Sequence, residues 1–196
     1  MEKINIKIII GSTRQNRFGE KPAKWIYEEA KKLEKVEVEL LDLRNYPMPF
    51  FNSSLSPATA QGKYEDEIVQ KWSEKIKEGD AFIIITPEYN HGYPAVLKNA
   101  IDVIYSEWNK KPIGFVSYGG VGGARSVEQL RQVAIGLQMA PIRNAIHITG
   151  EMFFKAIADR NSQNFEVFEP LREQLQNFLN ELLWWAKTLK NGRANK

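Results

Sequence analysis

The sequence predicts a three-layer α/β fold, in which a five-stranded parallel sheet is covered by helices on both faces. Short apolar runs alternate along the chain with amphipathic stretches of helical period, which is the pattern of repeated strand–helix units. Three of the strand-to-helix connections also carry more polar and glycine residues than a connector needs. Helical crossovers join parallel strands, and five such strands favour the order 2-1-3-4-5. This is the order of flavodoxin-like proteins.

Five segments have the composition of strands in a parallel sheet. Most are continuous apolar runs rich in β-branched residues, which indicates burial on both faces. The second segment alternates apolar and charged residues, which is the period of a strand with two different faces. In chain order, the expected strands are residues 3–10, 36–43, 81–86, 112–118 and 141–148.

Five further segments have apolar residues at helical spacing. In the second of them, Ile68, Trp72 and Ile76 are four residues apart. The third begins at Pro94. A proline is well tolerated at the start of a helix, because the N–H that it lacks would have no partner within the helix there. Prolines and serines mark residues 45–59 as a loop. In chain order, the expected helices are residues 20–33, 64–77, 94–105, 124–139 and 169–189.

Composition excludes several classes of function. The 196 residues are expected to form one domain over 1–190, followed by a disordered basic tail at 191–196. A net charge of +3, without a basic stripe interleaved with aromatics, predicts no nucleic-acid partner. The absence of cysteine excludes disulfides and thiolate chemistry, and suits a cytoplasmic location. No apolar run has the length of a membrane span, and two histidines without clustered carboxylates predict no metal site.

The connection after the first expected strand has the composition of an anion site. Residues 11–19 lead into a helix N-terminus, where free backbone N–H groups and the helix dipole favour anions. Two arginines and two hydroxyls suit phosphate, although neither a Walker motif nor a dinucleotide Gly-x-Gly-x-x-Gly turn is present. The alternative is a polar turn with solvated arginines. The expected cofactor-binding residues here are Ser12, Thr13, Arg14, Asn16, Arg17, Phe18 and Gly19.

The connections after the third and fourth expected strands suit a flat ring with polar edges. One is rigid, polar and aromatic, and the other is a glycine run that lets a backbone approach a flat group closely, unless it is only a flexible turn. Arg125 opposes the dipole of the helix that follows, which suggests an anionic partner. A phosphorylated planar cofactor, FMN, would fit all three connections. The expected ring-binding residues are Pro87, Glu88, Tyr89, Asn90, His91, Ser117, Tyr118, Gly119, Gly120, Gly122 and Gly123.

Three segments resemble a known family in order and spacing. Residues 11–25 resemble the phosphate loop of the NAD(P)H-dependent FMN reductases. Residues 87–102, which include the Pro-Glu-Tyr-Asn stretch, are similar to that family's flavin-contacting loop and helix, and residues 118–131 to its third segment. The resemblance spans about residues 6–148.

The resemblance implies a flavodoxin-like fold, bound FMN, and hydride transfer from NADPH or NADH to flavin N5 and on to a quinone, azo compound, free flavin or similar small acceptor. No catalytic side chain is implied, because the flavin carries the chemistry. Glu88 and Tyr89 would hold the ring, while Asn90 and His91 would flank it or face the acceptor. The family's members are typically dimers or tetramers, so a homodimer or homotetramer is expected.

Two other functions are compatible with these loops. A flavodoxin-type electron carrier would use the same cofactor, but such carriers are usually acidic, whereas this chain has a net charge of +3. An interaction module that has lost its ligand is the other, and the retained arginines and glycines argue against it.

Four residues outside the three connections have other expected roles. Asp42 ends the second expected strand, but without a dinucleotide glycine motif it is interpreted as a cap or turn residue. His147 is expected to be structural. Tyr105 and Trp108 suit either the core or a subunit interface.

Overall fold

The computed structural model describes residues 3–194, and its strands and helices alternate as predicted. Five strands form one all-parallel sheet in the order β2-β1-β3-β4-β5. The predicted fold class is therefore confirmed, and β4 begins and ends at the predicted residues. The strands are β1 Ile4–Ile10, β2 Val36–Asp42, β3 Ala81–Pro87, β4 Pro112–Tyr118 and β5 Ala140–Ile148.

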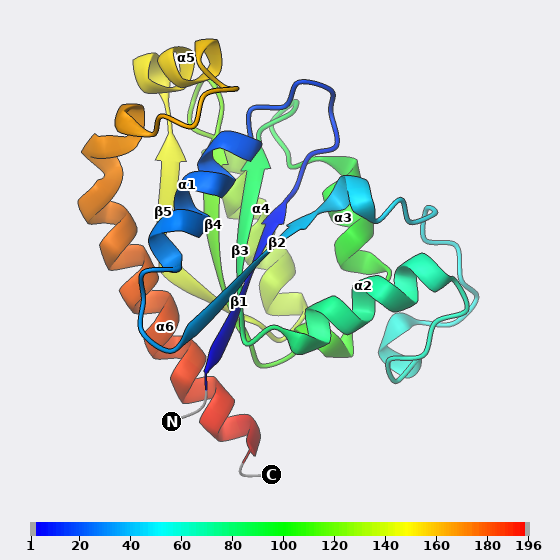
Figure 1. Cartoon of the computed structure of the whole chain (residues 1–196). Coiled ribbons are helices and arrows are strands. Elements are labelled where there is room, and N and C mark those ends of the chain that lie inside the picture. The colour runs from blue at the N-terminus through cyan, green and yellow to red at the C-terminus, as the bar shows by residue number, and fades with distance from the viewer. Residues whose placement is uncertain (1–2, 195–196) are drawn as a thin grey trace.

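Helices cover both faces of the sheet. Helices α1 and α6 lie against one face, and α2, α3 and α4 lie against the other (Figure 1). Side chains of β1 alternate between the two sides, so that Ile8 and Ile10 join the core under α1 and α6, and Ile9 joins the other core. The helices are α1 Glu20–Ala30, α2 Glu67–Glu78, α3 Ala95–Asp102, α4 Ala124–Gly136, α5 Gly150–Ala158 and α6 Arg172–Ala194.

The C-terminal helix is longer than predicted. The basic tail was expected from residue 191, but α6 continues to Ala194, and residues 195–196 lie outside the described part of the chain. Arg193 donates to Asp80 at 2.9 Å and to the Lys110 carbonyl at 2.7 Å, and Lys190 donates to the same Asp80 carboxylate at 2.8 Å. These contacts fix the last turn of α6 against the start of β3.

Two further features differ from, or go beyond, the predictions. Helix α5 was not predicted, although Phe153 and Ile157 are four residues apart, and it lies beyond the carboxyl end of β5 (Figure 1). Trp108 belongs to the core, with 1% of its surface exposed and its ring 5.0 Å from that of Phe82. None of the helices within residues 3–194 combines the length and apolarity needed to cross a membrane.

Candidate functional site

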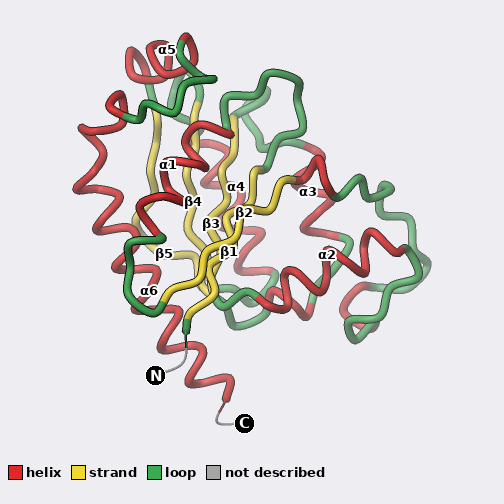
Figure 2. The backbone as a smooth tube through the Cα atoms, in the orientation of Figure 1, coloured by secondary structure: helices red, strands yellow, loops and turns green. Residues whose placement is uncertain are grey.

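Three loops meet where the carboxyl ends of β1, β3 and β4 lie side by side (Figure 2). We call them loop 1 (residues 11–19), loop 3 (residues 88–94) and loop 4 (residues 119–123). The hydroxyls of Ser12 and Tyr89 are 2.9 Å apart and join loop 1 to loop 3. The amide of Glu88 donates to the carbonyl of Tyr118 at 3.2 Å and joins loop 3 to the start of loop 4. The sheet order thus brings together the three connections that the sequence singled out.

Loop 1 divides into an exposed rim and a buried base. Thr13 is half-buried, and Arg14 and Asn16 are exposed; within residues 3–194 the Arg14 guanidinium has no hydrogen-bond or ion-pair partner. Phe18 is buried and packs edge-on against Tyr118, with ring centroids 4.9 Å apart. The rings of Phe18 and Tyr118 therefore belong to the core, and these two residues can meet a ligand chiefly through their backbone. Burial raises the pKa of Tyr118, so its phenol stays neutral.

Arg17 is turned away from the rim. Its guanidinium forms two hydrogen bonds with Asp42, at the end of β2, and others with Glu20 and the Ser12 carbonyl. Burial works against the charge of Arg17, but its hydrogen bonds to Asp42 and Glu20 and the negative charges of these two residues together outweigh burial, and the pKa of Arg17 is raised. The structure places the Arg17 side chain behind loop 1. Direct contact of Arg17 with a phosphate remains a prediction. Asp42 also accepts a hydrogen bond from the Arg44 amide at 2.9 Å. It therefore caps the turn that follows β2, in agreement with its interpretation as a cap or turn residue.

Arg44 is a residue that sequence reasoning missed. It lies on the short helix η1 Leu43–Asn45, which follows β2, and its guanidinium donates to the carbonyls of Thr13 and Arg14 and to Glu20. No local signal marks it, because loop 1 is about 30 residues away in sequence and meets Arg44 only through the pairing of β1 with β2.

Loop 3 contains a two-residue turn. The amides of Tyr89 and Gly92 each donate to the other's carbonyl, at 2.8 and 3.0 Å. The two central residues, Asn90 and His91, both have positive φ, of 50° and 69°, as in a type I′ turn. The side chains at the tip are exposed, and Gln129 fixes the turn by donating to the His91 carbonyl at 2.9 Å. Loop 3 therefore presents Asn90 and His91 to solvent on a rigid support.

Arg125 has the anionic partner that its position suggested. Its guanidinium donates to the Glu88 carboxylate at 2.6 Å, and its amide donates to the other oxygen at 3.3 Å. The Glu88 side chain is only 8% exposed. The Glu88 carboxylate is thus committed to the first turn of α4.

The conformation of loop 4 depends on glycine, most clearly at its last two residues. Gly122 and Gly123 have φ values of 75° and 72°. A Cβ on Gly122 would lie 2.4 Å from Thr149, and one on Gly123 would lie 2.7 Å from Ser117. Ser117 is buried, with its hydroxyl donating to the Gly122 carbonyl at 2.5 Å and lying 2.8 Å from His147 Nδ1. The Ser117 hydroxyl therefore supports loop 4 from beneath, and His147 has the structural role expected of it.

These residues fit a phosphorylated planar group. The amides of Thr13 and Gln15 have no acceptor within residues 3–194, and beside them stand the partnerless Arg14 guanidinium and the N-terminus of α1. A Cβ on Gly120 would meet nothing within 4 Å, so the outer side of loop 4 is open to a flat ligand. Within residues 3–194, no three His, Asp or Glu side chains gather as a metal site would need. The fold is that of a flavodoxin-like protein, and the three loops have the features expected of a phosphate loop beside a ring-binding edge.

Comparisons with known proteins agree with this class. The family model of the NADPH-dependent FMN reductases matches residues 4–152, and the chain belongs to that family. An NAD(P)H-dependent FMN reductase of Schizosaccharomyces pombe is 36% identical over 156 residues, which is 79% of this chain and 78% of the relative. A second, from Saccharomyces cerevisiae, is 37% identical over 145 residues, covering 69% and 76%.

Structural comparison gives the same fold. A flavoenzyme NAD(P)H:(acceptor) oxidoreductase of Paracoccus denitrificans superposes with a TM-score of 0.72 and 24% identity, covering 94% of this chain and 98% of the other. This structural match shows the fold, whereas the family match confirms the predicted family, with its FMN and NAD(P)H cofactors and its oxidoreductase class. The roles of individual site residues in binding FMN remain predictions.

Proposed function

We propose that the protein is an FMN-dependent NAD(P)H:acceptor oxidoreductase in which the reduced nucleotide and the acceptor use the same open edge in turn. The observation that carries this proposal is the meeting of a phosphate-type loop with two rigid, ring-sized loops at one sheet edge. FMN, when bound, supplies the chemistry by taking a hydride from the nicotinamide at N5 and passing it to the acceptor.

The chain's own residues bind and orient. Arg14 and the amides of Thr13 and Gln15 would hold the phosphate of FMN, since all three groups lack a partner within residues 3–194. The backbones of loops 3 and 4 would border the ring, and the Glu88–Arg125 ion pair keeps these loops together. Asn90 and His91, exposed at the tip of loop 3, would meet whichever molecule enters the open edge.

The proposed acceptor is a quinone or another small oxidised ring compound, such as an azo dye or free flavin. In support, a quinone reductase of Pseudomonas putida is 27% identical over 191 residues, covering 93% of this chain and 95% of the relative. The rigid tip of loop 3 and the open side of Gly120 suit planar acceptors better than bulky ones.

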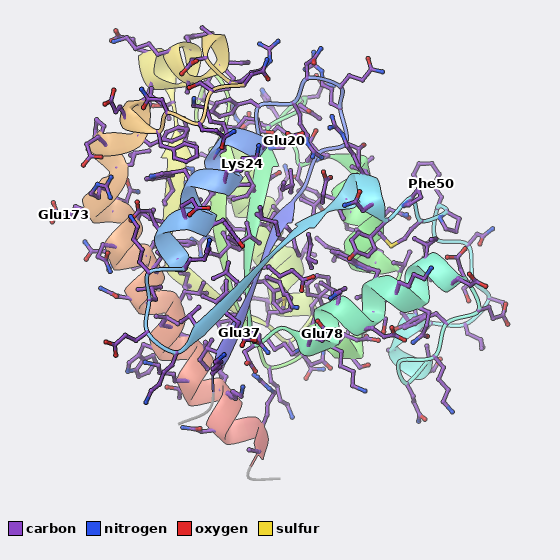
Figure 3. The ribbon with its side chains drawn as sticks, in the orientation of Figure 1. Glu20, Lys24, Glu37, Phe50, Glu78 and Glu173 are labelled. Carbon is purple, nitrogen blue, oxygen red and sulfur yellow. The ribbon has the colours of Figure 1, made fainter. Side chains whose placement is uncertain are left out.

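We further propose a cytoplasmic homodimer or homotetramer. The loop before α2 carries Phe50 and Leu55, which are 78% and 68% exposed, and Phe50 lies at the far edge of the molecule in Figure 3. Apolar residues exposed together often mark an association surface. Light scattering on the purified protein would test self-association, and a monomer at micromolar concentration would contradict it.

Flavin uptake tests the proposed function. The purified protein should be yellow or should become so when FMN is added, and the flavin should change its fluorescence on binding. A colourless protein that takes up no FMN would overturn the proposal. An FMN-loaded protein that forms a stable one-electron semiquinone but does not respond to NADPH or NADH would instead indicate a flavodoxin-type carrier.

A further inference from the structure

Arg44 lies behind loop 1, on the side of β2. Leu43 is 1% exposed and anchors η1 in the core, and the Asp42 carboxylate caps the same turn, so the Arg44 side chain leaves the sheet edge at a fixed point. From there its Nε donates to the Thr13 carbonyl at 3.3 Å, and its terminal nitrogens donate to the Arg14 carbonyl and, at 3.0 Å, to Glu20. Glu20 is in the first turn of α1 (Figure 3).

The contacts of Arg44 and Arg17 turn three consecutive carbonyls to one side. Arg17 holds the Ser12 carbonyl, and Arg44 holds those of Thr13 and Arg14. In a planar trans peptide, the N–H of the next residue points opposite to the carbonyl. The amides of residues 13–15 therefore point away from β2. The Arg14 amide confirms this direction, because it faces Ser12 Oγ at 3.3 Å, and that hydroxyl in turn contacts Tyr89 of loop 3.

The charges behind loop 1 compensate one another. Asp42 and Glu20 pair with Arg17, and Glu20 also pairs with Arg44. An arginine fork suits this task, since one planar group reaches two carbonyls and a carboxylate at once, which a lysine cannot do with the same geometry. The Arg14 guanidinium takes no part in this network, and Arg14 is exposed.

We propose that Arg44 is a positioning residue for the FMN phosphate: by holding the carbonyls of Thr13 and Arg14 on the β2 side, it keeps the amide of Gln15 directed at the phosphate. This inference rests on the proposed function, because it assumes that loop 1 receives the phosphate of FMN. It assigns a binding role to a residue outside the three loops, one that does not itself touch the cofactor.

Comparing FMN with riboflavin tests the proposal, because riboflavin has the same ring and lacks only the phosphate. Apoprotein carrying Arg44→Gln is titrated with each flavin while fluorescence is followed. We expect FMN to bind about tenfold more weakly or worse, the loss of one to two charge-assisted hydrogen bonds, with riboflavin affinity unchanged. Arg44→Lys, which keeps the charge and can reach Glu20, should give a smaller loss. Arg172→Gln is the matched control, since Arg172 is half-exposed and, among residues 3–194, pairs only with Glu169 and Glu29.

Each outcome decides the matter. Unchanged FMN affinity in Arg44→Gln would overturn the proposal. Equal losses of affinity for FMN and riboflavin would also overturn it, because they would show general damage to the site. If riboflavin binds too weakly to follow, inorganic phosphate replaces it: phosphate should raise the melting temperature of wild type and Arg172→Gln but not of Arg44→Gln, and an equal rise in all three would overturn the proposal. Wild-type protein that binds no FMN would instead remove the proposed function itself.

Discussion

The Glu88 carboxylate and the Arg125 guanidinium meet at 2.6 Å and join loop 3 to the first turn of α4. The carboxylate is almost fully buried, whereas the guanidinium is 44% exposed. A buried carboxylate needs a partner, because an unpaired charge away from water is strongly unfavourable. Glu88 is therefore held at the start of loop 3, and both of its carboxylate oxygens accept hydrogen bonds from Arg125.

Removing either member of this pair should lower the free energy of unfolding of the apoprotein, and the effects of the two substitutions should not be additive. In a double-mutant cycle with Glu88→Ala and Arg125→Ala, we expect a coupling free energy of about 1 kcal/mol in chemical unfolding. The exposed pair Lys98–Asp102 is the control, where a cycle should give about 0.3–0.5 kcal/mol. Additive effects of the Glu88 and Arg125 substitutions would show that the contact does not join the loops.

The two arginines of loop 1 should behave differently when removed. Arg14→Ala should lower FMN affinity about tenfold, the loss of a charge-assisted phosphate contact, and leave the free energy of unfolding within about 0.5 kcal/mol of wild type. Arg17→Ala should destabilise the apoprotein by about 2–3 kcal/mol, because it leaves the Asp42 carboxylate without its ion-pair partner. Urea unfolding of both variants checks this, and wild-type stability in Arg17→Ala would refute the supporting role.

Two glycine substitutions should distinguish a glycine that loop 4 needs for its conformation from one that leaves room for a ligand. Gly123→Ala should destabilise the apoprotein by about 1–3 kcal/mol, since φ is 72° and the new Cβ would lie 2.7 Å from that of Ser117. Gly120→Ala should leave unfolding unchanged, because its Cβ meets no atom within 4 Å. The same Gly120→Ala variant should bind FMN more weakly if the ring lies over loop 4. Equal stabilities of the two variants would contradict this account.

Lys111 should make stability rise with pH in a range where most proteins are insensitive. Its ammonium is buried and donates to the carbonyls of Ile76 and Lys77 at 2.8 and 2.9 Å. Burial, with a smaller effect from Arg193, lowers the pKa of Lys111 from 10.5 to about 7. Between pH 7 and 10 the unfolded chain thus binds more protons at this side chain than the folded chain does, so raising the pH favours folding.

The free energy of unfolding is expected to rise by about 1 kcal/mol per pH unit between pH 7.5 and 9.5. Urea unfolding across this range measures it. Lys111→Met should remove the slope, while Lys75→Met, at a partly exposed ion pair, should keep it. A wild-type stability that is flat or falling across this range would count against a neutral, buried Lys111.

Local pattern was enough to predict the sheet. Each strand was placed within one residue at both ends, because every one is a short apolar or alternating run with clear boundaries. Helix ends were less well predicted: α1 stops at Ala30 and α4 at Gly136, both before the expected residue, since the amphipathic pattern continues past the last helical turn. The basic residues near the C-terminus suggested a solvated tail, and only the fold places Asp80 beside them.

Residues that act through distant partners could not be predicted. The composition of loop 1 indicated phosphate binding, but the orientation of Arg17 depends on Asp42, which strand pairing brings alongside. Arg44 was not predicted for the same reason, because only the pairing of β1 with β2 brings it to loop 1. The Arg125 hypothesis succeeded because a cation at a helix N-terminus is locally unfavourable, and such a conflict is visible in the sequence itself.

Anaerobic reduction of the FMN-loaded protein tests the central claim most directly. NADPH or NADH, added in stoichiometric amount, should reduce the flavin by two electrons and bleach its visible absorption, and a quinone added next should restore that absorption. The Arg172→Gln protein should behave as wild type does. A protein that binds FMN yet keeps its absorption unchanged with both nucleotides would contradict the account.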